Sequence, residues 1–272
     1  MQYFPCHPQE IFLSPWRNRG LLKSLIVREV VGRYRGSMLG LLWSFFNPLI
    51  MLGIYTFVFG IIFSSRWSGG TGNTSEFALI LFAGLIVFNF FGDCFTRAPS
   101  LILSHPNYVK KVVFPLEILP WVLIGSGFFH LLVSLGVWLL VYAVFMGMPH
   151  PHLLFLPLIL IPYSLFIAGA SWMLASVGVY LRDVAHVTGV FKTILLFLSA
   201  IFYPLEAVPE TLQNVMLLNP LILPIEMSRK VLYFGQLPPL GLWAAYSGVS
   251  FLVCYLGFVW FQKTRRGFAD VV

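Results

Sequence analysis

Charged side chains are scarce in this chain. They make up 10% of the residues, against 58% hydrophobic residues, whereas a soluble domain carries about 25% charged residues. Acidic residues are the rarest class, with 10 Asp and Glu against 17 Lys and Arg and a net charge of +7. The shortage of charge excludes an ordinary soluble domain, because no polar block is long enough to fold alone. We therefore expect an integral membrane protein.

Cysteine is also scarce. Cys6, Cys94 and Cys254 are an odd number, and the first two are expected on or near the reducing side of the membrane, so we expect no disulfide. A motif of two histidines, His150 and His152, offers fewer ligands than the three or four of a zinc site. We expect no metal, and interpret this motif as a polar hairpin tip.

Two motifs of enzymes are missing. The Lys-Ser and Lys-Thr pairs that begin at 23, 192 and 263 lack the preceding glycine of GxxxxGK[ST], which lets backbone amides surround a phosphate. The polar loops hold no converging set of acid, base and nucleophile. A membrane-embedded enzyme is therefore disfavoured, and we expect a chain with no catalytic residues and no cofactor of its own.

Long apolar runs are what the sequence has instead, and a membrane-spanning helix needs about 20 such residues. The predicted spans are 38–63, 77–96, two helices within 118–181 joined by the turn GMPHPH at 147–152, 184–205 and 242–261. The predicted fold is all-α, with a cytoplasmic N-terminal segment over 1–37 and a six-span domain over 38–272. The first apolar run begins at 38 and is too long for a cleavable signal core, so we expect an uncleaved anchor.

The distribution of basic residues predicts the orientation. With both termini in the cytoplasm, 13 Lys and Arg lie inside and 3 lie outside, as the positive-inside rule requires. Anionic membrane lipids explain the net positive charge, so no nucleic-acid partner is expected.

The N-terminal segment predicts an amphipathic helix on the cytoplasmic membrane surface. Ser14-Pro15 is a typical helix start, and Gly36 is suited to end the helix and turn the chain into the bilayer. Apolar residues recur at helical spacing between them, at Leu22, Leu25, Ile26, Val30 and Tyr34, opposite basic ones. Pro48 should kink the first span, either for packing or for function.

Four segments resemble a known family. They are RYRGSMLGLLWSFFNPL at 33–49, HPNYVKKVVFPLEILP at 105–120, YLRDV at 180–184 and LLNPLILPIEMSRKVL at 217–232. In this order they are similar to the permease subunit of bacterial polysaccharide ABC exporters, the type 2 ABC permease group that exports O-antigen, teichoic acid or capsule.

The resemblance implies a multi-pass homodimer in the bacterial cytoplasmic (inner) membrane. Two copies of a separate ATPase, which binds ATP-Mg, would drive export of a lipid-linked polysaccharide. The opening motif looks closest to the O-antigen branch, with capsule and wall teichoic acid as alternatives. An ion-coupled secondary transporter is a more distant one, because Asp93 and Glu117 lie at span ends and the sequence shows one re-entrant pair rather than two.

The resemblance also suggests residues that couple the permease to the ATPase. The expected footprint is Tyr108, Val109, Lys110 and Lys111 in the first cytoplasmic loop, Arg182 and Asp183 in the second, and Arg28 and Arg33 on the surface helix. The alternative for the two lysines is that they only enforce the positive-inside topology.

Other residues are candidates for the transport path. Lys192 either snorkels to the headgroups or contacts phosphate groups of the substrate. The aromatic residues Tyr55, Phe59, Phe63, Phe202 and Tyr203 either stack on sugars or pack at the membrane interface.

Two further groups of polar residues have simpler interpretations. Asp93 should be neutralised by Arg97. Residues 206–238 should form two short helices that dip in from outside, with Asn219 and Pro220 at the break and Glu226 and Arg229 spaced as a helical ion pair.

Overall fold

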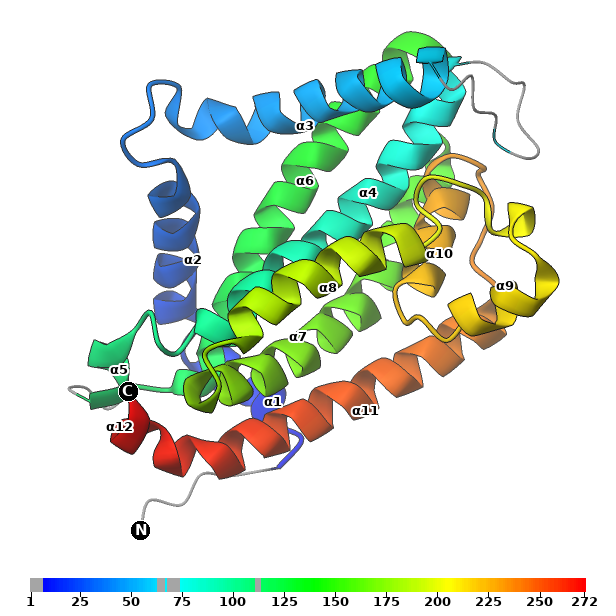
Figure 1. Cartoon of the computed structure of the whole chain (residues 1–272). Helices are drawn as coiled ribbons and strands as arrows, with labels where there is room; N and C mark the ends of the chain where they lie inside the picture. Colours follow the sequence, from blue (N-terminus) through cyan, green and yellow to red (C-terminus); the bar gives the residue numbers. More distant parts are fainter. Residues whose placement is uncertain (1–6, 63–66, 68–73, 111–113) are drawn as a thin grey trace.

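The structure is a computed structural model that describes residues 7–62, 67, 74–110 and 114–272. Most of these residues are helical (Figure 1). The helices in chain order are α1 (Glu10–Arg17), α2 (Arg19–Tyr34), η1 (Gly40–Leu42), α3 (Trp43–Tyr55), η2 (Thr56–Ile62), α4 (Thr74–Arg97), η3 (Ala98–Ser100), α5 (Pro106–Lys110), η4 (Leu116–Ile118), α6 (Leu119–Met146), η5 (Pro151–Phe155), α7 (Leu156–Tyr180), α8 (Val184–Leu198), η6 (Leu205–Ala207), α9 (Glu210–Met216), α10 (Ile222–Leu232), α11 (Leu240–Thr264), η7 (Arg265–Gly267) and α12 (Phe268–Val271). Figure 1 shows α1, α5 and α12 at one end of the long helices and α9 and α10 toward the other.

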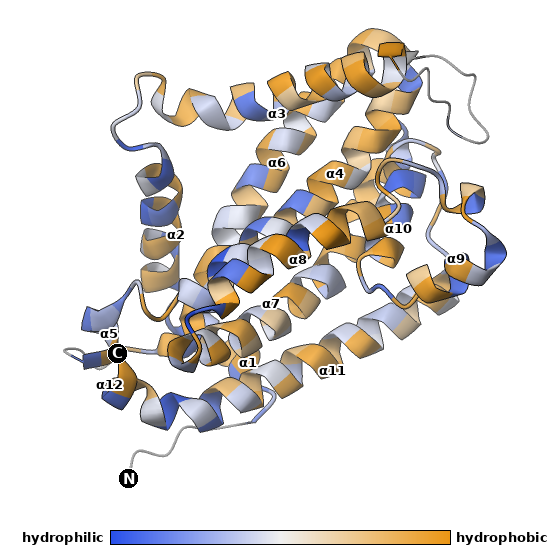
Figure 2. Ribbon diagram, viewed as in Figure 1, coloured by the Kyte–Doolittle hydropathy of each residue, from blue (hydrophilic) through white to orange (hydrophobic). Residues whose placement is uncertain are grey.

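Five helical stretches in the described residues are long and apolar enough to cross a membrane. They are Gly40–Ile62, Ser75–Ser100, Leu116–Met146, Pro151–Tyr180 and Leu240–Val271. The predictions for 38–63, 77–96, the hairpin within 118–181 and 242–261 are confirmed as helices. Figure 2 shows hydrophobic residues along most of α3 and α4, and many hydrophilic ones in α2 and α5.

The predicted span at 184–205 is wrong in its length. Its helix, α8, has 15 residues and ends at Leu198, which corresponds to a rise of about 22 Å, less than the ~30 Å hydrocarbon core. The chain leaves the helix because Ala200 adopts a φ of 50°, a left-handed conformation that cannot continue a right-handed helix.

The N-terminal segment forms two helices rather than one, with a break at Asn18. The predicted helix start at Ser14-Pro15 is wrong, because both residues lie inside α1. The Ser14 hydroxyl donates a hydrogen bond to Glu117 Oε1 at 2.9 Å instead of capping a helix. A partner distant in sequence therefore overrides the local capping signal.

The predicted apolar face and turn of the surface helix are confirmed. Leu25 and Val30 of α2 are buried, and α2 contacts α6. Gly36 follows with a φ of 88°, which a side chain rarely tolerates. The turn at Gly36 sends α3 off at a steep angle to α2 (Figure 1).

Helix α4 lies at the centre of the helical bundle. In its most hydrophobic stretch 89% of the residues are buried, and it contacts α3, α6, α7, α8 and α10. Two neighbours donate hydrogen bonds to its backbone: Trp138 Nε1 to the carbonyl of Leu79 at 2.8 Å, and the Tyr163 hydroxyl to that of Val87 at 3.2 Å. The positions of the other helices therefore depend on α4.

Helices α7 and α11 cross closely at two glycines. A Cβ on Gly169 would lie 2.4 Å from the carbonyl oxygen of Val253, and one on Gly257 would lie 2.2 Å from that of Gly169. Small residues permit such close backbone approach in membranes, where packing rather than the hydrophobic effect drives helix association. The crossing fixes the last long helix against the rest of the bundle.

Candidate functional site

A network of four charged side chains fastens α2 to the C-terminal end of α4. Arg33 donates to Asp93 Oδ2 at 2.7 Å, and Arg97 donates to the same oxygen at 3.4 Å. Arg97 also forms an ion pair with Glu29. The predicted Asp93–Arg97 pair is present, but it belongs to a larger network that the sequence reasoning did not anticipate.

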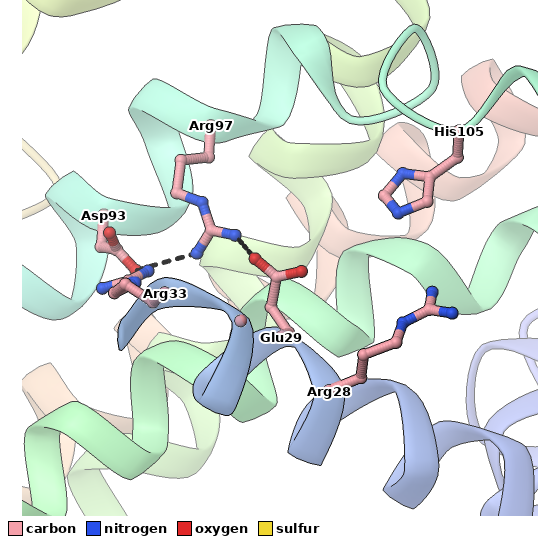
Figure 3. A pocket seen from close by; sticks show the side chains of 7 residues that line it. Arg28, Glu29, Arg33, Asp93, Arg97 and His105 are labelled. Atoms are coloured by element: carbon pink, nitrogen blue, oxygen red, sulfur yellow. Dashed lines mark hydrogen bonds and ion pairs between the residues drawn. The ribbon is translucent and has the colours of Figure 1, made fainter. Parts of the chain in front are cut away.

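A cavity of about 500 Å³ lies around this network. Its lining is Arg28, Glu29, Gly32, Arg33, Asp93, Arg97 and His105. Figure 3 shows the side chains of α2 and α4 meeting across it, with Arg28 and His105 on its other side. At this end burial raises the pKa of the Tyr34 phenol; the positive charge of Arg33 opposes this shift and the negative charge of Asp93 adds to it.

The predicted coupling loop is held by contacts within the chain. The Tyr108 ring stacks on Phe114 with centroids 4.3 Å apart, and its hydroxyl accepts a hydrogen bond from Arg28 at 2.6 Å. Val109 packs against the core. Lys110 is exposed, and Lys111 lies outside the described residues.

The second predicted coupling segment lies in the connection between α7 and α8. Arg182 and Asp183 are both exposed there. Helix α12 contacts both α5 and α7, so the two loops belong to the same end of the molecule (Figure 1). The structure brings the described members of the predicted coupling set to one end, together with α2.

Glu117 forms a second charged junction at this end. Its carboxylate accepts from Arg265 at 2.6 Å and from the Ser14 hydroxyl at 2.9 Å. Arg265 also donates to the carbonyl of Phe114 at 2.7 Å. The junction ties α1, the segment before α6 and the end of α11 together.

A buried arginine organises the opposite end. The guanidinium of Arg229 on α10 is fully buried. Its nitrogens donate to the carbonyls of Ile80, Ala200 and Ile201 at 3.2, 2.8 and 2.8 Å, and it pairs with Glu226 at 2.5 Å. The predicted ion pair is therefore present, but three backbone carbonyls share its cation.

The surroundings of Arg229 are shaped for it. The guanidinium lies over the ring of Trp67, 4.5 Å from its centroid. A Cβ on Gly84 of α4 would lie 2.6 Å from Arg229 Nη2, so only glycine leaves room there. Arg229 thus joins α4, α10 and the chain just after α8.

The break between α9 and α10 adds another tie to the end of α8. The Asn219 amide donates to the carbonyl of Leu198 at 3.2 Å and to the Ser199 hydroxyl at 3.0 Å, while its oxygen accepts from the backbone amide of Leu221 at 3.0 Å. The turn at Pro220 separates the two helices. The two short helices predicted for this segment are confirmed.

The aromatic candidates fall into two groups. Phe202 stacks on Phe59 with centroids 5.1 Å apart and lies 6.2 Å from Tyr55, so these three rings form one cluster. Tyr203 instead donates its hydroxyl to the carbonyl of Phe197 at 2.6 Å. Phe63 lies outside the described residues.

Lys192 on α8 packs its side chain against the backbone of α4. A Cβ on Gly92 would lie 2.6 Å from its Cε. It lines a cavity of about 230 Å³ together with Arg33, Asn89, Asp93, His130 and Ser134. Asn89, His130 and Ser134 were missed as candidates, although a polar residue inside an apolar span is itself a signal of function.

A metal site has no support in the described ranges 7–62, 67, 74–110 and 114–272. No three His, Cys, Asp or Glu side chains gather there closely enough to hold an ion. Cys94 and Cys254 are both buried free thiols, and Cys6 lies outside these ranges.

Comparison with known proteins finds one matching family model and similar permease proteins. The family model described as "ABC-2 type transporter" matches residues 20–233. The chain is 27% identical over 259 residues to the O-antigen export system permease protein RfbA of Myxococcus xanthus, covering 94% of this chain and 97% of that protein. It is 28% identical over 135 residues to a protein of the same name from Klebsiella pneumoniae, covering 48% and 49%.

The buried arginine leads to a stability prediction. Arg229→Met should lower the free energy of unfolding by about 3 kcal/mol, because three buried carbonyls and Glu226 lose their donor. Arg229→Lys should recover little, since one ammonium cannot reproduce the spread of guanidinium donors. The measurement is thermal unfolding in detergent, with Lys230→Met on the same helix as the control. Equal unfolding temperatures for Arg229→Met and Lys230→Met would contradict this role.

Proposed function

The chain belongs to the ABC-2 type transporter family, and we propose that it is the permease subunit of an ABC transporter that exports a lipid-linked O-antigen polysaccharide. The substrate assignment is supported by the near full-length similarity to a relative named as an O-antigen export permease. The chain is a multi-pass membrane protein. Capsular polysaccharide and wall teichoic acid are the alternative cargoes.

The working unit proposed is a homodimer of this chain with two ATPase subunits. The absence of GxxxxGK[ST] from the sequence supports this division, because that loop binds the phosphates of ATP in such enzymes. ATP-Mg would be held by the partner, and this chain would provide the passage.

The proposed topology has six crossings and cytoplasmic termini. Ser14 near the start and Arg265 near the end both bond to Glu117, so α1 and the end of α11 lie on the same side. An even number of crossings is needed for that, which supports α8 as the sixth crossing despite its length. α9 and α10 would then dip in from the external side, with their break at Asn219 and Pro220.

The proposed ATPase footprint consists of exposed residues at the cytoplasmic end. Asn107 and Lys110 on α5 and Arg182 and Asp183 between α7 and α8 are free to meet a partner. Arg28 and Arg33 of α2 lie beside them. Because Tyr108 and Val109 pack within the chain, their expected effect on docking is to hold the loop in place.

The export reaction can be tested in vesicles that contain this chain and its partner ATPase. We expect ATP-driven transfer of a lipid-linked glycan across the bilayer. Lys110→Glu should weaken ATPase binding about tenfold, since it replaces a favourable charge pair with repulsion, and should slow export in proportion. Lys263→Glu on α11 is the control and should bind and export normally.

Two results would count against this assignment. Transfer driven by an ion gradient without the ATPase would favour a secondary transporter. Normal ATPase binding by Lys110→Glu would leave the loop lysines with a topological role only.

The topology can be tested with two exposed asparagines. In a version without native cysteines, Asn214→Cys on α9 should react with an impermeant maleimide added to intact cells, while Asn107→Cys on α5 should react only after lysis. Six crossings place these residues on opposite sides. Labelling of Asn107→Cys in intact cells would refute the arrangement.

The aromatic cluster of Tyr55, Phe59 and Phe202 is proposed to line the sugar path, because rings stack on the C–H face of sugars without gripping hydroxyls. The alternative is packing alone, and the rings do contact one another. Changing Tyr55 and Phe59 to alanine should impair export of long glycans more than short ones. Phe251→Ala on the exposed side of α11 serves as the control. Equal export at every glycan length, with normal protein levels, would assign the cluster to packing.

A further inference from the structure

Three cavities along α4 share walls. The 500 Å³ cavity at the cytoplasmic end has Arg33 and Asp93 in common with the 230 Å³ cavity beside Lys192, which we call the inner cavity. A third cavity of about 290 Å³ shares Arg33, Asn89, His130 and Ser134 with the inner cavity and extends to Tyr55. The series therefore leads from the cytoplasmic end toward the aromatic cluster.

The inner cavity is polar at membrane depth. Asn89 lies about 17 Å from Ser100 along the axis of its span, near the middle of a hydrocarbon core of ~30 Å. It is the exposed residue in an otherwise buried stretch of α4 over 77–92. Polar groups at such depth are costly and mark binding sites or pathways. Here three different helices supply them, α4, α6 and α8.

Several of these groups have unused hydrogen-bonding capacity. Within the described residues, neither the Lys192 ammonium nor the Asn89 amide has a hydrogen-bond or ion-pair partner. His130 Nε2 is buried and also lacks one there, while Nδ1 has only a long contact of 3.4 Å with the Tyr34 hydroxyl. Among these groups His130 Nε2 is the buried one, and a buried group without a partner is costly, so the cavity suits a polar ligand.

The charge around the two cavities that share Arg33 and Asp93 is positive. Four cations, Arg28, Arg33, Arg97 and Lys192, face two carboxylates, Glu29 and Asp93. The Asp93 carboxylate is already bonded to Arg33 and Arg97, so it is not available to neutralise Lys192 fully. The surplus favours an anion.

Lys192 is also placed by the backbone of α4. Its Cε would lie 2.6 Å and its Nζ 3.4 Å from a Cβ on Gly92. The lysine stem therefore lies against bare helix backbone, with its ammonium at the cavity wall.

We propose that the inner cavity binds the phosphate group of a membrane-embedded amphiphile. A phosphate offers several oxygens to donors that converge from different helices, namely the Lys192 ammonium, the Asn89 amide, the His130 imidazole and the Ser134 hydroxyl. The volume of 230 Å³ is below the ~300 Å³ of the smallest drug-sized pockets, so it suits a phosphate rather than a glycan chain. The identity of this phosphate rests on the proposed function: it is the phosphate that links the lipid to its glycan.

Binding can be measured on the full chain in dodecyl maltoside, which carries no phosphate. The probe is dodecyl phosphate, with dodecanol as the uncharged counterpart and native mass spectrometry as the readout. Lys192→Met should weaken dodecyl phosphate binding about tenfold or more, and Asn89→Ala about fivefold, as expected for loss of a charged and a neutral donor. Lys263→Met, an exposed lysine on α11, should bind like the parent, and dodecanol should show no dependence on Lys192.

Two further probes distinguish the source of the phosphate. Glucosyl dodecyl phosphate and phosphatidylglycerol are compared as competitors of dodecyl phosphate. Stronger competition by the sugar phosphate assigns the site to the lipid-linked substrate, and stronger competition by phosphatidylglycerol assigns it to a bilayer lipid. Both results support a phosphate site.

Parental binding of dodecyl phosphate by both Lys192→Met and Asn89→Ala would overturn the proposal, with Asn89→Ala covering the case in which Lys192→Met fails to fold. The site and the proposed function can fail separately. Lys192-dependent binding in a chain that exports no glycan would leave the site and remove the function. Export by the parent, together with dodecyl phosphate binding that depends on neither Lys192 nor Asn89, would leave the function and remove the site.

Discussion

Helix association in a bilayer cannot rely on the hydrophobic effect, because lipid tails are as apolar as the helix surfaces. Close backbone packing and polar contacts must do this instead, and in this protein they converge on α4. Gly84 and Gly92 leave bare backbone against which Arg229 of α10 and Lys192 of α8 lie. The carbonyl of Leu79 accepts a hydrogen bond from Trp138 on α6. The positions of three neighbouring helices thus depend on small residues and free carbonyls of one helix.

The short α8 and the buried Arg229 are two aspects of one arrangement. A helix that ends within the membrane leaves carbonyls without partners, and hydrocarbon supplies no donor. Arg229 donates to the carbonyls of Ala200 and Ile201, and Asn219 donates to that of Leu198. A cation near a helix C-terminus is also favoured by the helix dipole. The early end of α8 is therefore stabilised by α10 and by the break that precedes it.

The long apolar runs, the hairpin at 147–152 and the turn at Gly36 could be predicted, because each depends on residues that are neighbours in the chain. The end of α8 could not be predicted, since the apolar run continues to Leu205. Arg229, whose guanidinium donates to the carbonyl just after this end, comes 29 residues after Ala200 in the chain. The predicted helix start at Ser14 was wrong for the same reason, because Ser14 bonds to Glu117, 103 residues away. Contacts between distant segments override local signals at both places.

Candidate residues were predicted singly, but their partners were not. Glu29 and Arg33 on α2 are spaced four apart, as are Asp93 and Arg97 on α4, and because both helices carry the acid before the base, an antiparallel alignment lets each meet its complement. This repeated order is visible in the sequence and is compatible with antiparallel pairing of the two helices. Asn89 and His130 gain meaning only once α4 and α6 are placed side by side. Arg33 lines all three cavities, so under the proposed function a shift of α2 on ATPase docking would alter the walls of the whole series at once.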